Sequence, residues 1–167
     1  SIPVLYNTHS YEKAESLKII DPYVDVYIPD MKFVSPVISK KYTGKSNYFE
    51  VASKAIEFML NSKKTVIENG IIKSGVIVRH LILPDNVADS KRVIDWFYES
   101  QKNGAYLSLM AQYTPFGDIK NFKELQRKIT EKEYNKVLEY AVLSGLENVF
   151  AQELTSSGED FIPSWDY

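Results

Sequence analysis

Short apolar runs alternate with amphipathic stretches about four times along this chain, and no other feature limits its fold as strongly. The apolar runs predict strands at 2–8, 23–32, 75–84, 105–113 and 147–153. The stretches between them have helical spacing at 11–20, 36–42, 48–60, 88–102 and 131–144. Alternation of this kind predicts an α/β domain built on a parallel sheet with right-handed crossovers.

Local signals indicate where several of these elements begin. Helix caps are expected at Ser10, Ser35, Asn47 and Thr130, and the last two resemble capping boxes. Asn69-Gly70, between two apolar runs, predicts a small β-hairpin inserted before the longest strand. No linker of disordered composition interrupts residues 1–167, which we therefore expect to form a single domain with a loop-like tail at 154–167.

Composition excludes several classes of function. The chain contains no cysteine, so its own residues cannot form disulfides, cysteine–zinc sites, a thiolate nucleophile or iron–sulfur ligands. A net charge of −2 gives no general attraction to nucleic acid or to an anionic membrane. No apolar run approaches the roughly 20 residues of a membrane-spanning helix, and the expected location is the cytoplasm. Because the chain starts with Ser1 and enters a strand at once, we expect it to be part of a larger protein.

Polar residues gather where the predicted strands end. In parallel α/β folds, ligands bind at the carboxyl ends of the strands. The candidates, in chain order, are Asn7, Thr8, His9, Asp30, Lys32, Arg79, His80, Gln112, Tyr113 and Thr114. Each of them also has a structural explanation, as a turn, cap or strand-end residue, and their convergence on one rim is what indicates a site.

Arg79 is the most informative of these residues, because a guanidinium within a buried strand needs a partner or a wet cavity. One interpretation is a structural ion pair with Asp30, and the other is a position lining a ligand cavity. His80 alternates with Arg79 and so faces the opposite side, where a hydrogen-bonded core histidine is expected. His9 is expected to be a loop residue.

Familiar catalytic motifs are absent from the sequence. There is no phosphate-binding glycine loop, no G-x-S-x-G and no H-E-x-x-H, and two distant histidines make a poor metal site. We therefore assign no catalytic or metal-binding residue. Two alternatives stay open: an aldolase or isomerase of the TIM-barrel type that uses Lys32 as a Schiff-base or acid/base residue, and a non-catalytic interaction module.

Four motifs at the strand ends, taken in order, resemble a known family. "LYNTHSY", "VYIPDMK", "VIVRHLILPDN" and "LSLMAQYTP" resemble the second half of radical S-adenosylmethionine (radical SAM) proteins, specifically those similar to pyruvate formate-lyase activating enzyme. The resemblance implies a partial (β/α)6 barrel of which this chain supplies the later strands. The family's C-x-x-x-C-x-x-C loop, which holds a 4Fe–4S cluster, does not occur here. The cluster would therefore belong to the full-length protein only, and the chain alone is expected to be inert.

The resemblance also implies roles for residues after the first two strands. Asn7 stands where activating enzymes carry an aspartate that contacts S-adenosylmethionine. Together with Thr8 and Asp30 it corresponds to a group around a monovalent cation, a site that an amide at position 7 would weaken. Lys32 matches a lysine near the methionyl carboxylate, which is a charge-assisted contact.

Further along the chain, Arg79 matches an arginine of the barrel interior near the cofactor. Gln112 and Tyr113 complete the expected cofactor-binding set, with Tyr113 at the position of a histidine near the adenine. Asp85 replaces a usual glycine, so the turn there is expected to differ.

The implied activity of the whole protein is reductive cleavage of S-adenosylmethionine to a 5′-deoxyadenosyl radical that abstracts hydrogen from a substrate. The implied partner is a glycyl radical enzyme or a small molecule. We also expect the edge of the first strand, left unpaired, to be covered by dimerisation.

Overall fold

The computed structural model describes residues 2–152, and the structural statements that follow concern this range. Its strands are β1 (Leu5–Thr8), β2 (Val26–Pro29), β3 (Val66–Glu68), β4 (Ile71–Leu81), β5 (Tyr106–Met110) and β6 (Val149–Ala151). Its helices are α1 (Ala14–Ile20), α2 (Pro36–Thr43), α3 (Tyr48–Ser62), α4 (Val87–Ser100) and α5 (Glu131–Leu143), with short 3₁₀ turns η1 (Asp21–Tyr23) and η2 (Lys123–Gln126). The loop predicted at 154–167 lies outside the described residues.

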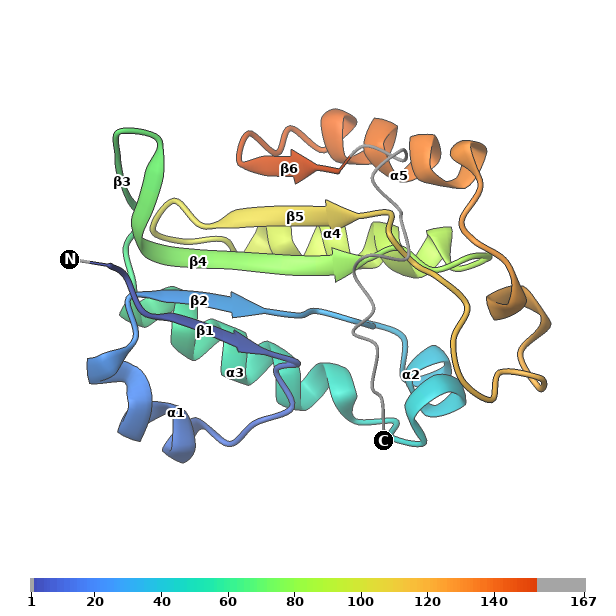
Figure 1. Cartoon of the computed structure of the whole chain (residues 1–167), viewed down its shortest axis with the longest axis horizontal. Helices are drawn as coiled ribbons and strands as arrows, with labels where there is room; N and C mark the ends of the chain where they lie inside the picture. The colour runs from blue at the N-terminus through green and yellow to red at the C-terminus, as the bar shows by residue number, and fades with distance from the viewer. Residues whose placement is uncertain (1, 153–167) are drawn as a thin grey trace.

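The strands form one sheet in the order β1-β2-β4-β5-β6, and every pair along this path is parallel. Their arrows accordingly point the same way in Figure 1. Consecutive strands of the path are neighbours, as in the wall of a barrel. The α/β class and the partial barrel expected from the sequence are therefore confirmed.

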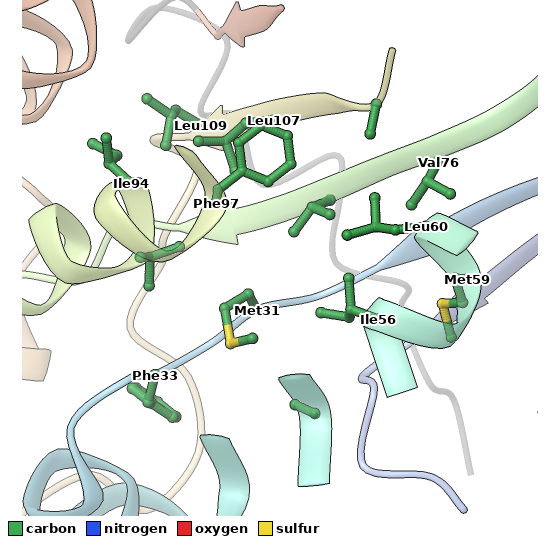
Figure 2. Close-up of a cluster of buried hydrophobic side chains, with 14 of the residues drawn as sticks. Met31, Phe33, Ile56, Met59, Leu60, Val76, Ile94, Phe97, Leu107 and Leu109 are labelled. Atoms are coloured by element: carbon green, nitrogen blue, oxygen red, sulfur yellow. The ribbon is translucent and has the colours of Figure 1, made fainter. Parts of the chain in front are cut away.

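The hydrophobic core lies on one side of this sheet. Val76 of β4 and Leu107 and Leu109 of β5 lie among core side chains of α3 and α4 in Figure 2. Val78 of β4 belongs to the same core, and all four are buried. The alternate residues Ile77, Leu81 and Met110 point to the opposite side and are only partly buried. We call these two sides the helix face and the inner face. Parallel sheets usually have both faces covered, so the partly exposed inner face is an unusual feature of residues 2–152.

Two of the four predicted helix caps are confirmed, and two are wrong in detail. The Ser35 side chain accepts a hydrogen bond from the first turn of α2, and Thr130 forms the predicted capping box at the start of α5. Ser10 does not cap α1, which begins at Ala14; its backbone has a positive φ of 67° and its N–H donates to Thr8 Oγ1. Asn47 precedes α3 without a side-chain cap, because its Oδ1 instead accepts from the Tyr11 hydroxyl at 3.1 Å.

The predicted hairpin is present, with Asn69 and Gly70 at positive φ between β3 and β4. The hairpin is not a separate insertion, because its second arm is the first part of β4, a continuous strand of 11 residues at the centre of the sheet. Gly75, where the arm enters the parallel sheet opposite Val26, has φ +140°. Among residues 2–152, no helix has the length and apolar character needed to cross a membrane.

Candidate binding site at the carboxyl ends of the strands

Four of the predicted site residues meet at the ends of β1, β2 and β4. Asp30 lies between two cations: its Oδ1 accepts from Arg79 Nε at 2.9 Å, and its Oδ2 accepts from Lys32 Nζ at 2.8 Å. Arg79 Nη2 lies 2.7 Å from the same Oδ1 and donates to Asn7 Oδ1, also at 2.7 Å. We call Asn7, Asp30, Lys32 and Arg79 the rim cluster.

Backbone pairing places these side chains together. Asp30 and Arg79 face each other across an isolated parallel bridge, and the Asp30 N–H donates to the Thr8 carbonyl at 2.8 Å. Arg79 alternates with the buried Val78 and His80, so its side chain leaves the sheet on the inner face. Register and alternation together bring an acid, two bases and an amide from three strands to one point.

The rim cluster is open to solvent. The relative solvent-accessible surface areas are 16% for the side chain of Asp30, 28% for that of Arg79 and 41% for that of Lys32. Arg79 forms the ion pair with Asp30 that one interpretation predicted. The pair is not sealed in a dry interior, so the other interpretation, a position lining a ligand cavity, stays a prediction. A dry pair would have favoured the interaction module, and the observed exposure leaves the cations accessible to a ligand.

His80 is the hydrogen-bonded core histidine that the sequence predicts. It is 2% exposed, and its ring nitrogens lie 2.8 Å from the Met31 carbonyl and 2.9 Å from Ser90 Oγ. Because a carbonyl can only accept, Nδ1 carries the hydrogen, and Nε2 accepts from the serine. Burial lowers the pKa of His80 below its ordinary value. His9, as predicted, lies exposed in the loop after β1.

Thr8 is not brought into the rim cluster. Strand alternation turns its side chain to the helix face, where Oγ1 bonds to Glu12 and accepts from the Ser10 N–H. Glu12 also accepts from the Tyr6 hydroxyl at 2.9 Å, and burial together with this bond raises the pKa of Tyr6. Glu12 was not predicted as a site residue, although its spacing of four residues from Thr8 could have indicated the contact. A ligand-binding role for Thr8 stays a prediction.

Gln112 and Tyr113 lie beyond the end of β5, at the neighbouring part of the same rim. Gln112 Oε1 accepts from Gln152 at 3.0 Å, and the Tyr113 hydroxyl donates to the Leu125 carbonyl at 2.8 Å. The contact of Tyr113 lies within the long connection from β5 to α5, and that of Gln112 joins this connection to the residue after β6. Burial raises the pKa of Tyr113, which keeps its hydroxyl protonated. Their part in ligand binding stays a prediction.

The connection from β5 to α5, residues 111–130, is fixed to α2 by contacts that the sequence did not reveal. Glu124 accepts from Lys41 Nζ at 2.5 Å and from the Tyr42 hydroxyl at 2.7 Å, and these bonds lower its pKa to about 2. Phe122 packs edge-on against the Tyr42 ring at 5.4 Å. Partners 80 or more residues apart leave no local pattern in the sequence. The connection is therefore held beside the rim.

The donor set of the rim cluster suits a zwitterionic organic ligand. With Asp30, Lys32 and Arg79 charged, the cluster carries a net charge of +1, and Lys32 is its most exposed cation. An exposed ammonium can bind a carboxylate, while the oxygens of Asn7 and Asp30 can accept from an amine. In the part of the chain that the structure describes, no group of three or more His, Cys, Asp or Glu side chains could hold a metal ion.

No family model matches the chain. In sequence it is similar to the uncharacterized protein MJ0674 of Methanocaldococcus jannaschii, with 26% identity over 150 residues, which are 90% of this chain and 41% of that protein. The chain thus spans less than half the length of this relative. In structure it is similar to a crystal structure of a domain of pyruvate-formate lyase-activating enzyme from Bacteroides vulgatus. The TM-score is 0.60 at 11% identity, and the match covers 87% of this chain and 79% of that one. The two share a fold.

Proposed function

We propose that this chain is the S-adenosylmethionine-binding part of a radical SAM enzyme similar to pyruvate formate-lyase activating enzyme. The single observation that carries the proposal is the rim cluster, in which one carboxylate holds two accessible cations at the carboxyl ends of parallel strands. The shared fold with an activating-enzyme domain and the four ordered motifs at the strand ends support it.

The rim residues fit the methionyl part of that cofactor. Lys32 would bind the carboxylate, because it is the cation with the larger exposed fraction and Asp30 is its one ion-pair partner among residues 2–152. The oxygens of Asn7 and Asp30 would accept from the amine. Arg79 takes the supporting role of holding both of these oxygen-bearing side chains in place.

The fit is weaker around the adenine. The Tyr113 hydroxyl is already engaged by the Leu125 carbonyl, so its contribution would come from the ring, through stacking, and not from a new hydrogen bond. Gln112 accepts from Gln152 through Oε1 and donates one amide hydrogen to Met110 Sδ at 3.9 Å, which leaves its second amide hydrogen for a base.

An iron–sulfur cluster does not fit this chain, because the 167 residues contain no cysteine. We therefore assign to these residues only binding and orienting the cofactor and excluding water from it. In the whole protein, one electron from a cluster held elsewhere would break the S–C5′ bond of S-adenosylmethionine and release methionine and a 5′-deoxyadenosyl radical. The hydrogen donor is proposed to be a glycyl radical enzyme or a small molecule.

The proposal is tested by titrating the 167-residue chain with S-adenosylmethionine in a calorimeter. Loss of one charge-assisted contact should weaken binding about tenfold, so Lys32→Ala should raise the dissociation constant by that factor. Lys54→Ala is the matched control, since Lys54 forms an exposed pair with Glu50 on α3, away from the rim. No binding by the unmodified chain, or equal binding by Lys32→Ala, would overturn the proposal. The aldolase alternative instead predicts that borohydride traps a carbonyl compound on Lys32.

A further inference from the structure

The segment Asp30–Lys32 carries the carboxylate and the ammonium of the rim cluster, and its backbone is fixed from three directions. Its first N–H donates to the Thr8 carbonyl, and its second N–H donates to the Arg79 carbonyl, each at 2.8 Å. The carbonyl of its middle residue accepts from His80 Nδ1 at 2.8 Å. These bonds join the segment to β1, to β4 and to the helix face of the sheet.

Two of the three remaining backbone groups of this segment, the Asp30 carbonyl and the Lys32 N–H, meet at a single side-chain atom, the hydroxyl oxygen of Tyr48. This oxygen lies 2.8 Å from the Asp30 carbonyl and accepts from the Lys32 N–H at 3.1 Å. It also lies 3.0 Å from the His9 carbonyl, in the loop after β1. Since a hydroxyl has one hydrogen, Tyr48 donates to either carbonyl in turn while accepting from Lys32.

The Tyr48 ring is held as firmly as its hydroxyl. Tyr48 is the first residue of α3 and is 4% exposed. Phe33, directly after the segment, packs edge-on against its ring at 5.9 Å, and the Tyr11 ring stacks parallel to it at 6.2 Å. Burial also raises the pKa of Tyr48 well above its usual range, so the hydroxyl stays neutral and can both donate and accept.

We infer that Tyr48 is a positioning residue, whose hydroxyl joins the loop after β1 to the segment after β2 and thereby sets where the side chains of Asp30 and Lys32 stand. The inference rests on the proposed function only for the identity of the ligand. The placement of Lys32 beside Asp30 is a property of the chain alone, and it can be measured without any ligand.

The chain contains a matched control for this hydroxyl. Tyr42 belongs to the same row of aromatic side chains, since its ring contacts Phe33 at 5.8 Å. Its hydroxyl bonds to Glu124 and Asn86 and has no contact with the Asp30–Lys32 segment. Tyr42→Phe therefore removes a half-buried hydroxyl from the same row and leaves the rim backbone bonded.

The test compares Tyr48→Phe and Tyr42→Phe in the 167-residue chain by two readouts that need no ligand. Hydrogen exchange at the Lys32 amide should be at least tenfold faster in Tyr48→Phe and unchanged in Tyr42→Phe. Labelling of Lys32 by an amine-specific reagent, normalised to the exposed Lys54 of the same molecule, should rise severalfold in Tyr48→Phe alone. Equal results for the two variants would overturn the inference.

Titration with S-adenosylmethionine then separates the inference from the proposed function. We expect Tyr48→Phe to raise the dissociation constant about tenfold. If the unmodified chain binds no S-adenosylmethionine, the proposed function fails, and the exchange and labelling results still decide the role of Tyr48. Should Tyr48→Phe not fold, Phe33→Leu loosens the Tyr48 ring and keeps its hydroxyl. It should change Lys32 labelling in the same direction by a smaller factor, and no change would count against the inference.

Discussion

Asp30 holds two cations, and the structure predicts that one of these pairs is several times stronger than the other. Arg79 reaches Asp30 with two nitrogens, at 2.9 and 2.7 Å, and both side chains are mostly buried. A two-point, charge-assisted contact of this kind is worth about 2 kcal/mol. Lys32 makes one contact, at 2.8 Å, from a side chain that is 41% exposed, and solvent screening limits such a pair to about 0.5 kcal/mol.

Two double-mutant cycles measure these coupling energies. Asp30→Asn is combined with Arg79→Gln in one cycle and with Lys32→Gln in the other, and the free energy of unfolding is obtained from urea titrations at pH 7. The exposed pair of Lys54 with Glu50, at 2.9 Å on α3, gives a reference cycle of about 0.4 kcal/mol. We expect the coupling of Asp30 to Arg79 to exceed the reference by at least about 1 kcal/mol, and that of Asp30 to Lys32 to match it.

A coupling of Asp30 to Lys32 as large as that to Arg79 would refute the reasoning. In that event Lys32 would be bound to the protein too strongly to turn toward a ligand carboxylate. The expected order instead makes Arg79 the structural partner of Asp30 and leaves Lys32 available at small cost.

Three further predictions concern pH, backbone conformation and the sheet edge. Burial lowers the pKa of His80, so as the pH falls the unfolded chain takes up a proton at this residue at a higher pH than the folded chain does. The free energy of unfolding should therefore decrease below about pH 6.5, by up to about 1.4 kcal/mol per pH unit. Urea titrations at pH 7.5 and 5.5 should show this loss equally in His9→Gln, and a pH-independent stability would contradict it. Gly75→Ala should lower the free energy of unfolding by about 3 kcal/mol, because φ is +140° and the added Cβ would lie 2.8 Å from Thr65 Oγ1. Gly70→Ala is the control: its added Cβ would lie in open space, and thermal unfolding should show a loss of only about 1 kcal/mol. Light scattering should show that the chain is a dimer, paired through the edge of β1. Leu5 is 52% exposed at this edge, and Leu5→Lys should make the chain monomeric. A monomeric unsubstituted chain would argue against edge pairing.

Much of the fold could be predicted because it depends on patterns within single segments. The capping box at Thr130 and the hairpin at Asn69-Gly70 are local and were found where expected. Ser10 was misassigned because a competing local bond, from its own N–H to Thr8, was energetically available and holds the chain in a turn.

The candidate site was predictable to the extent that strand ends converge. Asp30, Lys32 and Arg79 meet because parallel pairing places the carboxyl ends of β2 and β4 side by side. Thr8 was grouped with Asn7 although adjacent strand residues point to opposite faces, so only one of the two could join the cluster. Tyr48 was missed because its hydroxyl serves segments 16 and 39 residues away, which no sequence period encodes.

The one-sided core has a consequence for how such a chain can change during evolution. Stability depends on the helix face, where residues such as Val78 and Leu107 are fully buried, while Ile77 and Met110 on the inner face are partly exposed. A polar substitution at Ile77 or Met110 therefore removes less buried apolar area than the same change at Val78 or Leu107. The inner face can therefore accumulate substitutions while the helix face keeps the same scaffold folded.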